Sequence, residues 1–170
     1  MTISRLLLPE LEHEMANTRR ILENIPEDKL AWKPHTKSMT MGRLAGHVAE
    51  LASWGTHTLK LETLDISPKA DGTYEAHVMT SRADTLAKFD AWVAEAKEAL
   101  RETSDEDFQK NWSLTGSGQT YLSMPRIDVM RGMVLNHMVH HRGQLTVYLR
   151  LNDVRVPGMY GPTAADARTF

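Results

Sequence analysis

The chain has 170 residues, 41% of them hydrophobic and 25% charged, which is typical of a folded globular protein and not of a disordered one. Its formal net charge of −2 gives no reason to expect nucleic acid as a partner, and no apolar run approaches the roughly 20 residues of a membrane-spanning helix. The absence of cysteine excludes disulfides, cysteine-ligated metals and a cysteine nucleophile.

The first helix is predicted from Thr2 or Ser4 to Asn24, where leucine and methionine recur at helical spacing and charged residues occupy the other faces. Pro9 is a weak point near its start, and the regular helix could begin only there. The N-terminal stretch turns acidic too soon for a signal peptide, so we expect a cytoplasmic protein.

After a connector, the second helix is predicted to begin with Ser38 or Thr40 as its N-cap and to continue to about Leu64. Its apolar stripe contains one histidine, His47. A lone histidine on such a stripe is more often a hydrogen-bonded core residue than a ligand, unless another helix presents further histidines to it. Glu50, one turn later, could orient the His47 ring or could face solvent, and solvent is the default.

Two glycines, Gly42 and Gly46, lie just before His47 and would allow close approach of a neighbouring helix or a ligand. His57 lies ten residues beyond His47, about 80° around the helix. The two histidines are therefore not expected to share a site.

The middle of the chain is predicted to be a connector over residues 66–80, a scaffold helix that starts at Ser81, and a long link over Thr103–Met124. Ser81 and Asp84 resemble a capping box. The link contains a Gly-Ser-Gly turn at residues 116–118 and several apolar side chains, which indicates an ordered flap.

The fourth helix is predicted from near Pro125 to about Leu151, and it carries three histidines within five residues. Positions four apart lie on the same helical face, so His137 and His141 can aim two imidazoles at one point. His140 is turned about 60° the other way from His137 and is the weaker partner. From the spacing alone, a metal site and a pair of surface histidines are equally good interpretations.

Four residues that follow on this helix also bear on the site. Gln144 and Tyr148 lie one and two turns beyond the second histidine of the pair and could bond to a substrate or to metal-bound water, although packing is an equally good role for Tyr148. Arg142 points away from the pair, which favours an ion pair. Gly143 costs about 1 kcal/mol relative to alanine in a helix, so we expect a close helix contact there.

The four predicted helices and the lack of extended alternation indicate an all-α, single-domain four-helix bundle with long connectors over residues 1–170. Within it, His47 on the second helix could complete a three-histidine site with His137 and His141. Zinc and similar ions accept three imidazoles and keep an open position, at which a carbonyl, a thiol or water can be activated.

Three segments, Met41–His47, His137–Leu145 and Val156–Pro162, are together similar to the DinB/YfiT-like family in motif, order and separation. The resemblance covers essentially the whole chain. It implies a four-helix bundle with non-consecutive helix pairing, often dimeric. It also implies a divalent metal held by the three histidines named above, so that we expect a homodimer with zinc or nickel, or iron as a further option.

The resemblance also suggests a function, because the wider group includes thiol-dependent S-transferases and isomerases. The leading hypothesis is a metal-dependent transferase that acts on a small-molecule substrate with a low-molecular-weight thiol, or a metal-dependent hydrolase. In both, Gln144 and Tyr148 would lie beside the metal. The alternative is a non-catalytic, stress-related bundle that binds a metal or a small ligand, with no membrane or nucleic-acid partner in either case.

Overall fold

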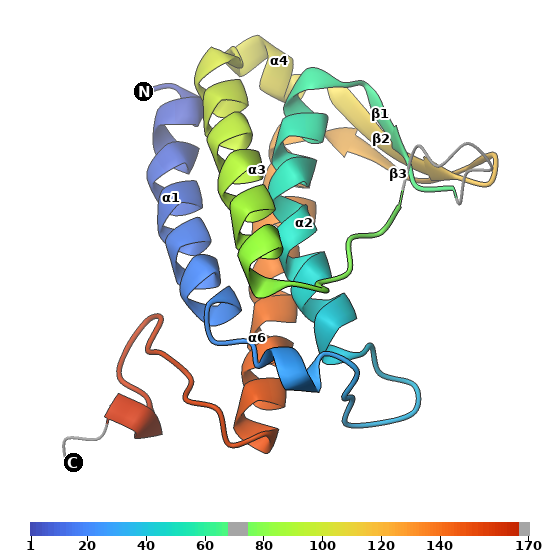
Figure 1. Ribbon diagram of the computed structural model, residues 1–170. Coiled ribbons are helices and arrows are strands. Elements are labelled where there is room, and N and C mark those ends of the chain that lie inside the picture. The colour runs from blue at the N-terminus through green and yellow to red at the C-terminus, as the bar shows by residue number, and fades with distance from the viewer. Residues whose placement is uncertain (68–74, 167–170) are drawn as a thin grey trace.

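The computed structural model describes residues 1–67 and 75–166, and it is mostly helical (Figure 1). Its long helices lie side by side, and they are α1 (Ile3–Leu22), α2 (Met41–Lys60), α3 (Arg82–Glu102) and α6 (His137–Leu151). Shorter helical segments are the 3₁₀ turns Glu27–Lys29 and Ala164–Asp166, α4 (Asp105–Gln109), α5 (Arg126–Val129) and a π-helical segment, Met130–Asn136.

The long helices do not pack in chain order. Helix α3 lies between α1 and α2, and α6 contacts both α1 and α2 from the other side (Figure 1). The pairs α1–α3 and α2–α6 are thus non-consecutive, whereas α2 and α3 follow each other along the chain. No helix in the described part of the chain combines the length and apolar character that a membrane span needs.

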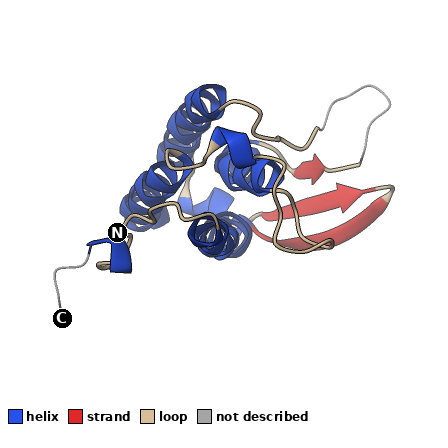
Figure 2. Ribbon diagram, turned by 60° about the horizontal axis from the view of Figure 1, so that its bottom comes forward, coloured by secondary structure: helices blue, strands red, loops and turns tan. Residues whose placement is uncertain are grey.

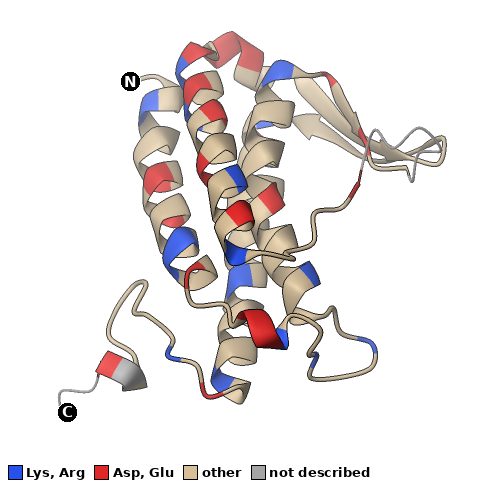
Figure 3. Cartoon of the chain, viewed as in Figure 1, with Lys and Arg blue, Asp and Glu red and all other residues tan. Residues whose placement is uncertain are grey.

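Charged residues of both signs follow one another along α1 and α3 (Figure 3). Some of them join the two helices, as in the ion pairs of Arg19 with Asp90 at 2.8 Å and of Lys97 with Glu12 at 2.7 Å. Because the side chains of these pairs are partly exposed to solvent, the pairs contribute little to stability, and the helices are held mainly by their apolar stripes.

A small three-stranded sheet corrects the all-α prediction (Figure 2). Strand β1 (Thr63–Asp65) pairs in parallel with β2 (Asn111–Gly116), which pairs antiparallel with β3 (Gln119–Pro125). Helix α2 ends at Lys60, four residues before its predicted end near Leu64, because the chain turns there into β1.

The predicted flap is thus a β-hairpin made of β2 and β3. Trp112 and Leu114 are buried and alternate with polar neighbours, which is the period of a strand with one face on the core. Ser117 and Gly118 have φ values of 51° and 76°, which suit a two-residue hairpin turn. The turn predicted at residues 116–118 is confirmed.

The predicted helix starts are confirmed at two N-caps. The Thr40 hydroxyl accepts a hydrogen bond from the Arg43 N–H at 3.2 Å, and the Ser81 hydroxyl accepts one from the Asp84 N–H at 3.2 Å. Pro9 lies inside α1, so the regular helix begins before the proline and not at it.

The fourth predicted helix is present but is not uniform. Its first turn, α5, leads into the π-helical segment Met130–Asn136, and regular α-helix resumes at His137. Single π-turns inside α-helices are often found at functional sites. Here the π-helical segment directly precedes the first histidine of the pair.

Gly42 and Gly46 do allow a close approach, but the neighbour is the connector that precedes α3. A Cβ atom at Gly42 would lie 2.8 Å from the carbonyl oxygen of Met79, and one at Gly46 would lie 2.2 Å from that of His77. The Met79 N–H donates to the Gly42 carbonyl at 2.9 Å, which fixes the connector against α2.

We expect Gly46→Ala to lower the free energy of unfolding by about 1–3 kcal/mol, because the added methyl group meets backbone that cannot rotate away. Urea unfolding measures this. Gly143→Ala is the matched control, since a Cβ atom there has no neighbour within 4 Å among the described residues, and it is expected to stabilise the helix by up to about 1 kcal/mol. Equal effects of the two variants would contradict the close contact at Gly46.

Candidate metal centre

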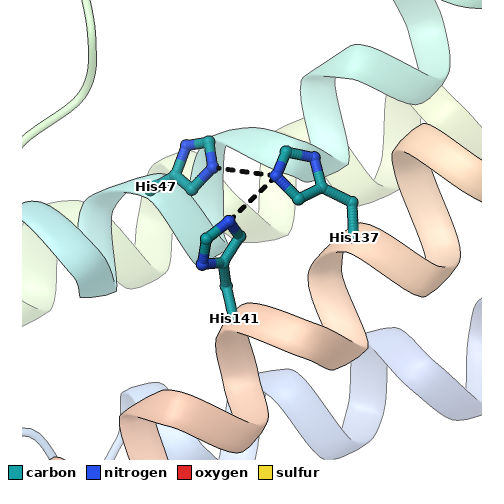
Figure 4. A group of neighbouring side chains, drawn as sticks. All are labelled: His47, His137 and His141. Carbon is teal, nitrogen blue, oxygen red and sulfur yellow. Dashed lines mark hydrogen bonds between the residues drawn. The ribbon is translucent and has the colours of Figure 1, made fainter.

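The structure brings together the three histidines that the sequence singled out (Figure 4). Helix α2 supplies His47, and α6 supplies His137 and His141. The Nε2 atom of His137 lies 3.4 Å from that of His47 and 2.9 Å from that of His141. All three potential ligand atoms lie within 4.8 Å of one another, so these histidines could hold a metal ion.

The spacing of these nitrogen atoms fits the coordination of a single metal ion by all three. With metal–nitrogen bonds of about 2.0–2.1 Å, two imidazole ligands stand roughly 2.9 Å apart at a right angle and roughly 3.3 Å apart at a tetrahedral angle. The contacts that His137 makes span this range. His57 and His140 are not in the group, as their predicted angles on the helices indicate.

The other nitrogen of each ring, Nδ1, faces an oxygen that can only accept a hydrogen bond. The partner oxygens are a Glu50 carboxylate oxygen for His47 at 2.6 Å, the Met133 carbonyl for His137 at 3.3 Å, and the Gln144 side-chain oxygen for His141 at 2.9 Å. We therefore place a proton on the Nδ1 atom of each ring. Three unprotonated Nε2 atoms then face one another, and their lone pairs repel unless a cation lies between them.

The protonation states of two rings support this assignment. Burial lowers the pKa of His141 to about 4, and burial together with the nearby His47 ring lowers the pKa of His137 below its usual value. Both rings are neutral near pH 7, which is the form that binds a metal.

Glu50 is buried against His47, so the expectation that it faces solvent is wrong. Its second carboxylate oxygen accepts a hydrogen bond from the His77 N–H at 2.7 Å, and Arg43 pairs with the first at 3.1 Å. Burial opposes ionisation of Glu50, but these bonds and the Arg43 charge outweigh it and hold the pKa of the carboxyl below its usual range. Glu50 is thus an ionised group that orients the His47 ring.

Gln144 and Tyr148 lie beside the histidines in different ways. Gln144 contacts the outer edge of the His141 ring and also lies 3.0 Å from the His140 Nε2 atom. The Tyr148 hydroxyl donates to the Met39 carbonyl at 3.2 Å. Both residues line an open pocket of about 410 Å³ that reaches His141. The rest of its wall comes mainly from the connector before α2, through Lys37, Ser38 and Met39.

Arg142 points away from the three histidines and forms the predicted ion pair, with Glu14 of α1 at 2.5 Å. Its guanidinium also donates to the Thr18 hydroxyl at 3.0 Å and to the Tyr160 hydroxyl of the C-terminal segment. The close helix contact expected at Gly143 is wrong, because no described residue of the chain comes within 4 Å of a Cβ atom placed there.

Comparisons with known proteins agree with this architecture. The model of the DinB family matches residues 1–169. The uncharacterised protein YrdA of Bacillus subtilis (strain 168) is 26% identical over 169 residues, which cover 96% of this chain and 91% of YrdA.

Solved structures show the same fold. A DinB-like protein from Bacillus cereus ATCC 10987 has a TM-score of 0.68 at 26% identity, with 94% of this chain and 98% of that chain covered. The DinB-like protein YjoA of B. subtilis has a TM-score of 0.67 at 18% identity, over 91% and 97% of the two chains. A mycothiol-dependent maleylpyruvate isomerase has a TM-score of 0.53 at 18% identity, over 84% of this chain and 60% of that one. By the match of its sequence over nearly its full length, the chain belongs to the DinB family.

Proposed function

We propose that the protein binds one divalent metal ion through the Nε2 atoms of His47, His137 and His141. The observation that carries this proposal is the convergence of three Nε2 atoms whose rings each place the other nitrogen against an oxygen acceptor. Three imidazole ligands suit zinc or nickel, and iron is also compatible. Among the described residues, no carboxylate oxygen joins this group, so a further position is left for a substrate.

We further propose a metal-dependent transferase that acts with a low-molecular-weight thiol, with a metal-dependent hydrolase as the second option. A metal at such a site lowers the pKa of a coordinated thiol or water molecule. The external thiol suits a chain without cysteine. The fold likeness to a mycothiol-dependent isomerase supports thiol chemistry by analogy. A cytoplasmic location and a homodimer stay predictions.

The chain's own residues would bind and orient the small-molecule substrate in the pocket of about 410 Å³ beside His141. Leu44 and Val147 offer apolar wall, and Lys37 offers a cation. Gln144 orients the His141 ring, and Tyr148 holds the connector through its bond to Met39. Tyr148 therefore shapes the pocket, because its hydroxyl is hydrogen-bonded to a backbone carbonyl and does not point at the substrate space.

Elemental analysis of untagged protein tests the metal, and we expect about one equivalent per chain. The metal-loaded protein is then mixed with bacterial thiols and electrophiles, and metal-dependent thiol consumption is expected. Cleavage by water without a thiol would favour the hydrolase. Stoichiometric metal without any turnover would favour the alternative, a non-catalytic metal-binding protein. A protein that takes up no metal would overturn the proposal.

We expect Glu50→Gln to weaken metal binding about 10–100-fold, as removal of a carboxylate that orients a ligand histidine usually does. The amide keeps the size of the side chain but loses the charge that holds the Nδ1 proton of His47. Competition with a chromophoric chelator measures the dissociation constant. Glu98→Gln, on the exposed side of α3, should bind metal like the unchanged protein.

A further inference from the structure

The connector that precedes α3 crosses α2 at the turn that carries His47. A Cβ atom at Gly46, the residue before His47, would lie 2.2 Å from the carbonyl oxygen of His77, so the two backbones are in direct contact. One turn earlier, the Met79 N–H donates to the Gly42 carbonyl at 2.9 Å. The connector thus packs against the turn of helix that presents one of the three converging histidines.

The guanidinium of Arg43 joins this connector to Glu50. Its Nη1 atom donates to a Glu50 carboxylate oxygen, Oε1, at 3.2 Å and to the His77 carbonyl at 3.1 Å, and its Nη2 atom donates to the same Oε1 at 3.1 Å. The other carboxylate oxygen of Glu50 accepts a hydrogen bond from the His77 N–H at 2.7 Å. One ion pair therefore binds both polar backbone groups of a single connector residue.

Glu50 transmits this constraint to the ligand. Its Oε1 atom lies 2.6 Å from the His47 Nδ1 atom, and Nδ1 and Nε2 belong to one rigid ring, so the position of the carboxylate sets the direction of Nε2. The side chains of Glu50, His47 and Arg43 are 6%, 11% and 26% exposed. Because the cluster is mostly buried, a hydrogen bond lost from it is not freely replaced by water.

We propose that Arg43 is a positioning residue for the metal centre. It holds Glu50 and the connector at His77 together, and thereby fixes the direction in which His47 presents its Nε2 atom. This inference rests on the proposed metal site. It implies a coupling in both directions, because binding effects between two sites are reciprocal: the anchored connector strengthens metal binding, and the bound metal strengthens the anchoring of the connector.

Replacing Arg43 by methionine tests the positioning role through the sign of its effect. We expect the dissociation constant for zinc, measured by competition with a chromophoric chelator, to rise about tenfold. Removal of a positive charge near a dication would by itself strengthen zinc binding, so charge and positioning predict opposite results. Arg150→Met, which removes an exposed arginine from α6, should bind zinc like the unchanged protein.

Combining Arg43→Met with Glu50→Gln shows whether Arg43 acts through Glu50. If it does, the double variant should bind zinc no more than about twofold more weakly than Glu50→Gln alone. Two effects that multiply would mean that Arg43 acts by another route, and would overturn the proposal. The double variant also lacks the unpaired buried carboxylate that destabilises Arg43→Met, and unchanged circular dichroism of the metal-free proteins verifies that the variants fold.

Amide hydrogen exchange of the unchanged protein tests the coupling without any substitution. Zinc should slow exchange of the His77 N–H at least about threefold more than exchange of the Ser113 N–H in the sheet, and equal slowing would contradict the coupling. A protein that binds no metal would overturn the metal centre and this inference with it. Zinc binding by the unchanged protein, with equal or tighter binding by Arg43→Met, would overturn this inference alone.

Discussion

Replacing His137 by alanine is expected to remove stoichiometric metal from the protein, whereas replacing His140 leaves the metal in place. The Nε2 atom of His137 is the central one of the three, with contacts to both His47 and His141. Its loss leaves two ligands on different helices. We therefore expect the metal to bind at least about a hundredfold more weakly. This is more than the usual effect of removing a group that only orients a ligand. Elemental analysis after dialysis measures the content, and chelator competition measures the affinity.

His140→Ala is a matched control because His140 lies on the same helix, three residues away, with its ring 4.9 Å from that of His141. It is exposed and lies outside the converging group. Metal loss in both variants, or in neither, would show that the ligands are assigned wrongly. Thermal unfolding of the metal-free variants separates this result from a folding defect, since both should melt close to the metal-free parent.

Replacing Arg142 by methionine is expected to lower the free energy of unfolding by about 3–5 kcal/mol, because it leaves a buried carboxylate without its cation. The Arg142 side chain is 1% exposed and its partner Glu14 is 12% exposed. The same guanidinium donates to the Glu14 carbonyl at 2.9 Å and to the Thr18 hydroxyl, so α1 loses several bonds at once. Urea unfolding of protein prepared without metal measures the effect on the fold alone.

Arg150→Met on the same helix controls for the loss of an arginine as such. Arg150 is exposed, and its replacement should change the free energy of unfolding by less than about 0.5 kcal/mol. A second variant, Arg142→Met combined with Glu14→Leu, should recover part of the loss, because it removes the unpaired carboxylate. If Arg142→Met alone is as stable as Arg150→Met, the buried ion pair contributes nothing to the fold.

The histidine centre could be predicted because it depends mainly on local geometry. The spacing of His137 and His141 fixes two ligands on one helical face, and any folded helix there would preserve it. His47 needed one further step, the packing of α2 against α6, which its apolar stripe indicated. The N-caps at Thr40 and Ser81 are local in the same sense.

The sheet and the environment of Glu50 depend on contacts between distant parts of the chain. Strand β1 has three residues and exists because it pairs with β2, about 50 residues later, so no periodic pattern marks it. The alternation of Trp112 and Leu114 with polar residues in β2 is short, and the sequence predicts an ordered flap for these residues, not a strand. Glu50 is buried because the backbone at His77 crosses α2 over Gly46, which spacing along one helix cannot reveal.

The π-helical segment Met130–Asn136 sets the rotational phase of α6 relative to the turn that precedes it. Each residue of an α-helix turns the chain by about 100°. The gain or loss of one residue in this segment would therefore rotate His137 and His141 away from His47, while both flanking helices stay intact. The length of this segment therefore determines which face of α6 carries His137 and His141 toward α2. Within such a fold, a change of one residue in length could redirect the ligands without any substitution among them.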